Sequence, residues 1–223
     1  MDALPRSALS ETDPRALRDY ARLAPVYDRL WAKYVGVSVR RTLDLLRLEG
    51  DERLLDVGCG TGVLLGALAR TRSRMTLVGL DPSRAMLAQA RARLGSSAAL
   101  DLGVATKLPY RDGAFDAVVS TSVLHAFPGP REAILAEWGR VLAPGGRLAL
   151  TDWRAGHWGT ATYNALLALA GRRQHPLVID TVVAELGSVG LGVEALEEFH
   201  VDAWGLVSVL ARKAPPGDGL GAA

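Results

Sequence analysis

Cysteine is almost absent from this sequence: Cys59 is the only one among 223 residues. A single cysteine excludes an intramolecular disulfide and any zinc site built on several thiolates. The four histidines, at positions 125, 157, 175 and 200, lack the spacing of metal ligands, so no metal is expected. This cysteine usage is typical of a reducing compartment, and we expect a cytoplasmic protein.

Long blocks of one charge and long apolar runs are also missing. The formal net charge is +2 at pH 7, without a run of five like charges, so we expect no nucleic-acid partner. No run of about 18 apolar residues occurs, so no membrane span is expected. The N-terminal segment is charged throughout and lacks the apolar stretch of a secretory leader.

The sequence does contain alternating strand-like and helix-like segments. Apolar runs typical of strands lie at 53–57, 75–81, 98–104, 115–120, 147–153, 193–201 and 204–212. Helical periodicity lies within 14–48 and at 63–70, 83–94, 131–142, 160–171 and 178–189. This alternation predicts an α/β fold with a doubly wound, mostly parallel, seven-stranded sheet that ends in an antiparallel hairpin strand.

The chain divides into three segments in this prediction. Residues 1–48 form an N-terminal helical cap, residues 49–213 form the ligand-binding domain, and residues 214–223 are a Pro/Gly-rich flexible tail. Ligands of such sheets bind at the carboxyl ends of the strands, so functional residues are expected there.

A glycine-rich loop follows the first predicted strand, in "LLDVGCGTG" (54–62). A simple turn needs only one glycine, so three of them indicate that a ligand approaches the backbone. The dinucleotide fingerprint is G-x-G-x-x-G, but the third glycine, Gly62, comes one residue early. Asp81, at the end of the second strand, is placed to accept hydrogen bonds from a ribose diol. The pattern favours an adenosine-type ligand.

"LLDVGCGTG", "GLDPS", "LPYRDGAFDAVVS", "LHAF" and "RVLAPGGRL" occur in the order and spacing of class I S-adenosylmethionine-dependent methyltransferases. The chain most resembles their ubiquinone/menaquinone-biosynthesis-like group of small-molecule methyltransferases, over residues 20–155. The resemblance implies S-adenosyl-L-methionine as cofactor, a small aromatic or lipophilic acceptor, and in-line methyl transfer.

The resemblance also implies roles for single residues. Gly58 and Gly60 pass close to the methionine part of the cofactor, and Asp56 shapes the loop or receives the amino group. Asp81 holds the ribose. The remaining contacts implied are Pro82 against adenine, Thr121 facing the methionine end or the acceptor, and Tyr27 closing over the pocket.

One position departs from the family pattern. The family has "GDA" where this chain has "GVA", so Val104 replaces a carboxylate that accepts a hydrogen bond from the adenine amino group. Adenine would then depend on backbone groups near Ala105 and on apolar packing. The loss of one such bond costs about 1 kcal/mol.

Two residues are candidates for acid–base catalysis. His125 follows the fourth strand, and histidine is the side chain that titrates near neutral pH. Asp152 ends the fifth strand. Structural roles stay open alternatives: a place in the pocket wall for His125, and a helix-capping or loop-shaping role for Asp152. An aromatic cover over the acceptor is expected from Tyr20, Tyr27, Trp31, Tyr34, Trp153, Trp158 and Tyr163.

Rival functions and the assembly stay open on the sequence alone. Because Val104 departs from the family pattern, one alternative to a methyltransferase is a non-catalytic relative that binds the cofactor. A nicotinamide-dependent oxidoreductase is a weaker alternative. Both a monomer and a homodimer are compatible with the sequence.

Overall fold

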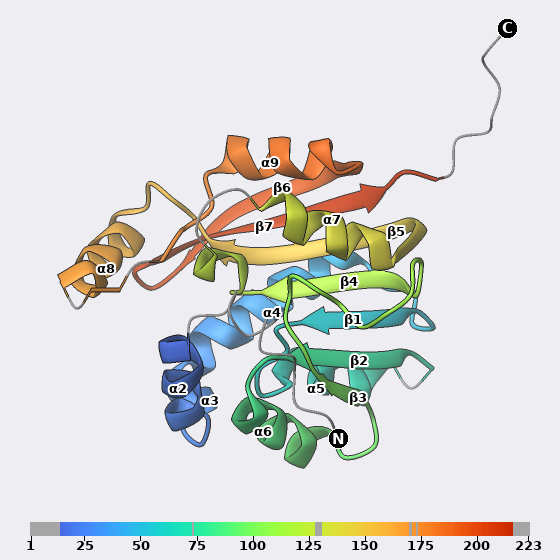
Figure 1. Cartoon of the computed structure of the whole chain (residues 1–223), viewed down its shortest axis with the longest axis horizontal. Coiled ribbons are helices and arrows are strands. Elements are labelled where there is room, and N and C mark those ends of the chain that lie inside the picture. Colours follow the sequence, from blue (N-terminus) through green and yellow to red (C-terminus); the bar gives the residue numbers. More distant parts are fainter. Residues whose placement is uncertain (1–13, 73, 128–130, 170, 173, 216–223) are drawn as a thin grey trace, which may run out of the picture.

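The structure is a computed structural model that describes residues 14–215 except 73, 128–130, 170 and 173. Its centre is a seven-stranded sheet with the strand order β3-β2-β1-β4-β5-β7-β6 (Figure 1). The strands are β1 (Arg53–Val57), β2 (Thr76–Asp81), β3 (Ala99–Leu102), β4 (Phe115–Thr121), β5 (Leu142–Trp153), β6 (Leu191–Val201) and β7 (Trp204–Lys213). β7 runs antiparallel to both neighbours. The predicted fold class is confirmed.

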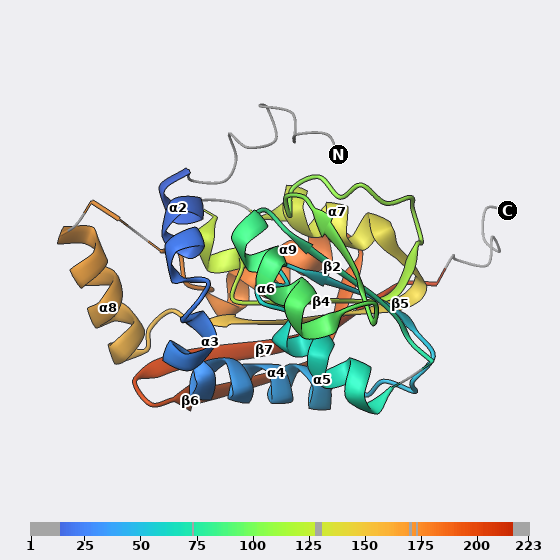
Figure 2. The ribbon, with the colours of Figure 1, turned by 90° about the horizontal axis from the view of Figure 1, so that it is seen from below.

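Helices cover both faces of the sheet (Figure 2). The helices are α2 (Pro14–Leu23), α3 (Tyr27–Leu30), α4 (Ala32–Leu46), α5 (Val63–Thr71), α6 (Arg84–Leu94), α7 (Glu132–Val141), α8 (Trp158–Leu169) and α9 (Ile179–Ser188), with a 3₁₀ turn η1 (Leu124–Ala126). One face packs against α4, α5 and α6, and the other against α7 and α9. The division of the chain at residue 48 stays a prediction, and α4 packs on the sheet itself.

Burial on both faces explains why the strands read as continuous apolar runs. Successive side chains of a strand point to opposite faces. Leu54 of β1 accordingly joins the core under α4, α5 and α6, while its neighbour Leu55 joins the core under α7 and α9. Both leucines are fully buried.

β5 differs from its predicted start at residue 147. It begins at Leu142, which pairs with Phe115, and the register then jumps to the pair Ala117 and Arg147. The predicted Pro-Gly-Gly turn is therefore a bulge within the strand, where Gly145 adopts a φ of 74°.

The strand order reverses at β1, which is the topological switch point of the sheet. β2 lies on one side of β1 and β4 on the other, so a crevice is expected at the carboxyl ends of these strands. α2, α3 and α8 lie at this end, toward which β1 and β4 point (Figure 1). The fold thus places a roof of three helices over the loops that follow the strands.

Candidate active site at the carboxyl edge of the sheet

Three neighbouring cavities occupy the space under these helices. The edge cavity, of about 160 Å³, follows β1 to β4 and is bordered by Gly60, Asp81 and Ala105. The inner pocket, of about 60 Å³, lies behind the glycine loop. The aromatic cavity, of about 390 Å³, lies between α2 and α8. Tyr27 and Ser122 border all three, so the cavities meet at these two side chains.

The glycine loop owes its shape to backbone conformations that other residues avoid. Gly58, Gly60 and Gly62 have φ values of 76°, 54° and 75°. A Cβ on Gly58 would lie 2.3 Å from Cγ2 of Val123, whereas a Cβ on Gly60 would meet nothing within 4 Å. Gly58 is thus required for packing and Gly60 leaves open space, as expected for a loop that admits a ligand.

We expect Gly58→Ala to lower the free energy of unfolding strongly. The substitution adds backbone strain of about 1 to 3 kcal/mol, and overpacking against Val123 adds a similar amount. Gly145→Ala is the matched control, because Gly145 has a similar φ of 74° and no neighbour within 4 Å of its Cβ. Urea unfolding of both variants measures the difference; equal losses would show that Val123 does not confine the loop.

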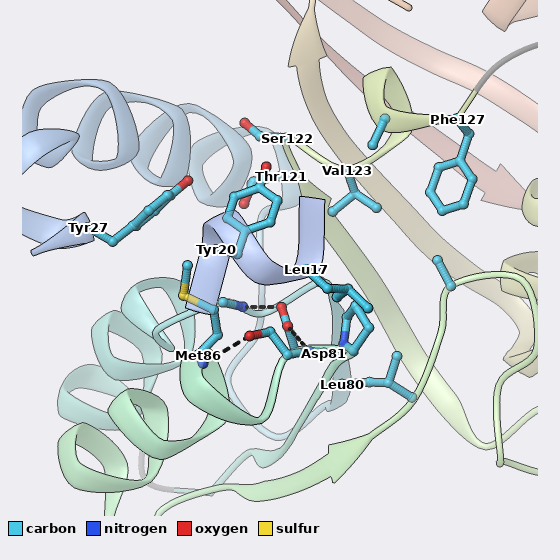
Figure 3. Close-up of a pocket in the computed structure, with 16 residues that line it drawn as sticks. Leu17, Tyr20, Tyr27, Leu80, Asp81, Met86, Thr121, Ser122, Val123 and Phe127 are labelled. Carbon is cyan, nitrogen blue, oxygen red and sulfur yellow. Dashed lines mark hydrogen bonds between the residues drawn. The ribbon is translucent and has the colours of Figure 1, made fainter. Parts of the chain in front are cut away.

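Asp81 joins the loop to the next strand. Its carboxylate accepts the backbone N–H of Gly60 at 2.9 Å and that of Ser83 at 2.8 Å (Figure 3). Burial raises the pKa of Asp81 to about 6, although these two bonds oppose the shift. The carboxylate borders the edge cavity, where the prediction placed it.

Asp56 lies at the inner pocket and is 1% exposed. Burial, reinforced by the charge of Asp81, raises the pKa of Asp56 to about 8. Its Oδ1 has no hydrogen-bond partner among the described residues. A buried carboxylate oxygen without a donor is costly unless a donor from outside, such as an ammonium group, completes it.

The raised pKa of Asp56 predicts a stability that depends on pH. The folded protein keeps this proton up to a pH of about 8, whereas an unfolded aspartate releases it near pH 4. The unfolded state therefore binds fewer protons in this window, and the free energy of unfolding falls as the pH rises, by up to about 1.4 kcal/mol per unit. Asp56→Asn should remove most of this fall in denaturant titrations of the ligand-free protein; an unchanged slope would contradict the assignment.

The wall of the edge cavity beyond Asp81 is apolar. Pro82, Met86 and Phe127 border it, together with Ala105, whose carbonyl accepts the indole N–H of Trp138 at 3.0 Å. Val104 is 2% exposed and does not itself border the cavity. The side chain that replaces the family carboxylate is thus part of the core.

His125 and Asp152 form one buried unit. His125 Nδ1 lies 2.6 Å from Asp152 Oδ1, and the backbone N–H groups of residues 123–125 donate to Oδ2 at 2.7 to 3.2 Å. Burial would raise the pKa of Asp152, but His125 and these hydrogen bonds hold it below its ordinary value. Asp152 is fully hydrogen-bonded, whereas His125 Nε2 has no partner among the described side chains and the ring borders the aromatic cavity.

Aromatic contacts fix the His125 ring. It stacks on Trp153 with a centroid distance of 4.2 Å and an interplanar angle of 5°. Trp153 Nε1 donates to Tyr34 Oη at 2.8 Å, and Tyr34 Oη lies 2.7 Å from Ser122 Oγ. Ser122 has a φ of 60°, a strained conformation for a non-glycine residue. The network thus holds Ser122 where the three cavities meet.

Most of the predicted aromatic cover borders the aromatic cavity. Its members here are Tyr20, Tyr27, Trp31, Tyr34, Trp153 and Tyr163. Trp158 was expected to join them, but its side chain is 69% exposed, so this part of the prediction is wrong. Burial, with the charges of Asp81 and Asp152, raises the pKa of Tyr20 to about 12, which keeps its phenol protonated.

No sequence pattern predicted the contacts that hold the roof helices in place. Thr61 of the glycine loop donates to Asp28 of α3 at 2.6 Å, and Arg93 of α6 pairs with Asp28. Arg172 pairs with Asp19 of α2 across the aromatic cavity. Leu17 and Tyr20 of α2 lie over the edge cavity (Figure 3). Such pairs join distant segments, and no local pattern reveals them.

The chain is similar to known methyltransferases. A family profile described as "Methyltransferase domain" matches residues 55–150. The nocamycin O-methyltransferase of Saccharothrix syringae is 30% identical over 222 residues, which cover 90% of this chain and 78% of the relative. The chain belongs to the class I S-adenosylmethionine-dependent methyltransferases. The predicted family and cofactor are confirmed.

Other members of the family match over shorter stretches or by fold. The demethylmenaquinone methyltransferase of Beutenbergia cavernae is 37% identical over 62% of this chain. The chain spans only about half (52%) of that relative, and 33% of a longer one. A methyltransferase structure from Thermotoga maritima superposes with a TM-score of 0.71 at 19% identity, over 87% of this chain and 97% of that one. Within the described part of this methyltransferase, every helix is too short or too polar to cross a membrane.

Proposed function

We propose that this methyltransferase transfers the methyl group of S-adenosylmethionine to a small, aromatic or lipophilic acceptor bound in the aromatic cavity. The observation that carries the proposal is the meeting of the three cavities at Tyr27 and Ser122. A nucleoside, its amino-acid tail and an acceptor then converge on one point, which is the requirement for in-line transfer.

The residues present suit the cofactor. Asp56 Oδ1, buried without a donor, matches the amino group in the inner pocket. Asp81 matches the ribose diol, and the apolar wall around Pro82 matches adenine. Because Val104 offers no hydrogen bond, adenine recognition depends on packing and on the backbone at Ala105. The assignment of these residues, of Gly58 and Gly60, and of Thr121 and Tyr27, is part of the proposal.

The bound cofactor supplies an electrophilic methyl group, so the chain itself must orient the acceptor and take up its proton. His125 acts as the general base through Nε2. Asp152 is a positioning residue: its carboxylate accepts a hydrogen bond from Nδ1–H, which leaves the Nε2 lone pair free for the acceptor. The stack on Trp153 prevents the ring from turning away. Burial raises the pKa values of the Tyr20, Tyr27 and Tyr34 phenols, so these three stay protonated and contribute hydrogen bonds and packing.

The lining of the aromatic cavity supports the acceptor class. Its six aromatic side chains favour flat or lipophilic molecules. Two relatives are a nocamycin O-methyltransferase and a demethylmenaquinone methyltransferase, names that indicate small-molecule acceptors for those proteins. A cytoplasmic location remains part of the proposal, and both a monomer and a homodimer are compatible with it.

Methyl transfer from labelled S-adenosylmethionine to a panel of phenols, quinols and amines tests the proposal. We expect stoichiometric formation of S-adenosylhomocysteine and methylated product with a phenol or quinol. Cofactor binding without turnover on any acceptor would instead support the non-catalytic alternative, and oxidation linked to NAD would support the oxidoreductase.

A further inference from the structure

Most of the large exposed apolar side chains lie on the helices at one end of the molecule. Among the described residues these are Leu23, Leu30, Trp158, Leu166, Leu169, Val178 and Val183, and the first five lie on the roof helices α2, α3 and α8. Leu166 is 60% exposed and Leu169 86% exposed. Isolated exposed leucines are ordinary, but several on neighbouring helices, with Leu23 at the border of the aromatic cavity, indicate an interaction surface.

α8 presents an unusual outer face. Its sequence, WGTATYNALLAL, has no charged residue. Its exposed residues recur at helical spacing, and all but Thr162 are apolar: Trp158, Ala161, Ala165, Leu166 and Leu169. α8 contacts the end of β7 through its first turn and extends beyond the sheet (Figures 1 and 2). The exposed face of a helix in a soluble protein normally carries charged side chains. The apolar face of α8 therefore indicates a surface that binds a partner.

Cations border the apolar face. Arg18 and Arg22 of α2 and Arg29 of α3 are exposed, and none of them has an ion-pair partner within the described residues. The acidic side chains on these two helices, Asp19 and Asp28, are already paired with Arg172 and Arg93. Exposed Trp and Leu flanked by unpaired arginines is the composition of a surface that lies on an anionic bilayer.

We propose that α2, α3 and α8 form a docking surface for the headgroup region of a membrane that contains anionic lipids. The aromatic cavity lies between α2 and α8 and is bordered by Arg22, Leu23 and Leu167, so its mouth would face the bilayer. A lipophilic acceptor could then enter without crossing water. A second copy of the chain fits less well, because a two-fold interface would bring the arginines of both copies together.

Co-sedimentation with vesicles tests this surface without cofactor or turnover, so its outcome is separate from that of the proposed methyl transfer. We expect binding to vesicles of phosphatidylcholine mixed with phosphatidylglycerol, and weak binding to phosphatidylcholine alone. Arg18→Gln with Arg29→Gln should reduce the partition coefficient about 25-fold, or about fivefold for each arginine. Leu166→Gln with Leu169→Gln should reduce it at least about tenfold.

Matched control variants carry the same types of substitution outside the proposed docking surface. Arg70→Gln with Arg74→Gln removes two exposed arginines at the opposite edge of the sheet, and Val183→Gln replaces an exposed apolar residue on α9. Both should bind vesicles as the wild type does. The proposal is overturned if the wild type ignores anionic vesicles, if the controls lose binding equally, or if Leu166→Gln with Leu169→Gln dissociates a dimer in analytical ultracentrifugation without changing vesicle binding.

Discussion

Asp81→Ala should weaken the binding of S-adenosylhomocysteine at least tenfold in isothermal titration calorimetry. The carboxylate orders the Gly60 and Ser83 N–H groups and is the proposed acceptor for the ribose hydroxyls. Each hydrogen bond to a charged group is worth about 1.5 to 3 kcal/mol, and tenfold in affinity is about 1.4 kcal/mol. Because the pKa of Asp81 is about 6 in the free protein, wild-type affinity should also fall as the pH drops below that value.

Asp101→Ala is the control for this experiment. Asp101 lies on β3 beside β2 and accepts the Tyr110 hydroxyl at 2.9 Å, outside the edge cavity. The same change of charge should leave the affinity nearly unaltered. Equal affinities for wild type and Asp81→Ala would refute the ribose assignment, while equal losses in both variants would indicate a general effect of charge.

His125→Asn should reduce kcat by roughly 10² to 10⁴ for an acceptor that must lose a proton. Asparagine can still donate to Asp152, but it has no counterpart of Nε2. Affinity for S-adenosylhomocysteine should stay close to that of the wild type. The rate of the variant should rise with pH as the acceptor ionises in solution, whereas the wild-type rate reaches a plateau.

Asp152→Asn separates positioning from base catalysis. Its amide can donate to His125 Nδ1, which favours the tautomer whose Nε2 already carries a proton and cannot accept another. We therefore expect a large fall in kcat with little change in KM. Unaltered kcat in both variants would show that His125 belongs only to the cavity wall, and lost cofactor binding would show that the pair is purely structural.

The sequence was sufficient where one local pattern determines the structure. The seven strands and the positions of Gly58, Gly60 and Asp81 at strand ends follow from apolar runs that end in a loop, whereas the order of the strands in the sheet comes from the structure. The hydrogen bond between His125 and Asp152 was not predicted from the sequence. It forms because β4 and β5 are neighbouring strands that pair Thr121 with Thr151 and so bring the two segments together. A sequence read as separate motifs does not reveal that they share one hydrogen-bonded unit.

The roof was the least predictable part. The aromatic residues near 150–165 were all predicted to line the pocket. In the structure Trp158 faces solvent, whereas Tyr163, on the same helix, borders the aromatic cavity. Which side of α8 faces inward depends on how the helix packs against β7 and α2. Because these are tertiary contacts, the local sequence of α8 does not predict its orientation. Gly159, whose Cβ would lie 1.8 Å from the Ala203 carbonyl oxygen, fixes the close approach of the helix.

Binding of S-adenosylhomocysteine to the full chain tests the central claim most directly. Calorimetry should show one molecule bound per chain, with NAD giving no heat under the same conditions. Binding should be accompanied by proton release below pH 8, because the cofactor amino group meets the carboxylate of Asp56 and lowers its pKa. Failure of the nucleoside to bind even at millimolar concentration would contradict the assignment of this site.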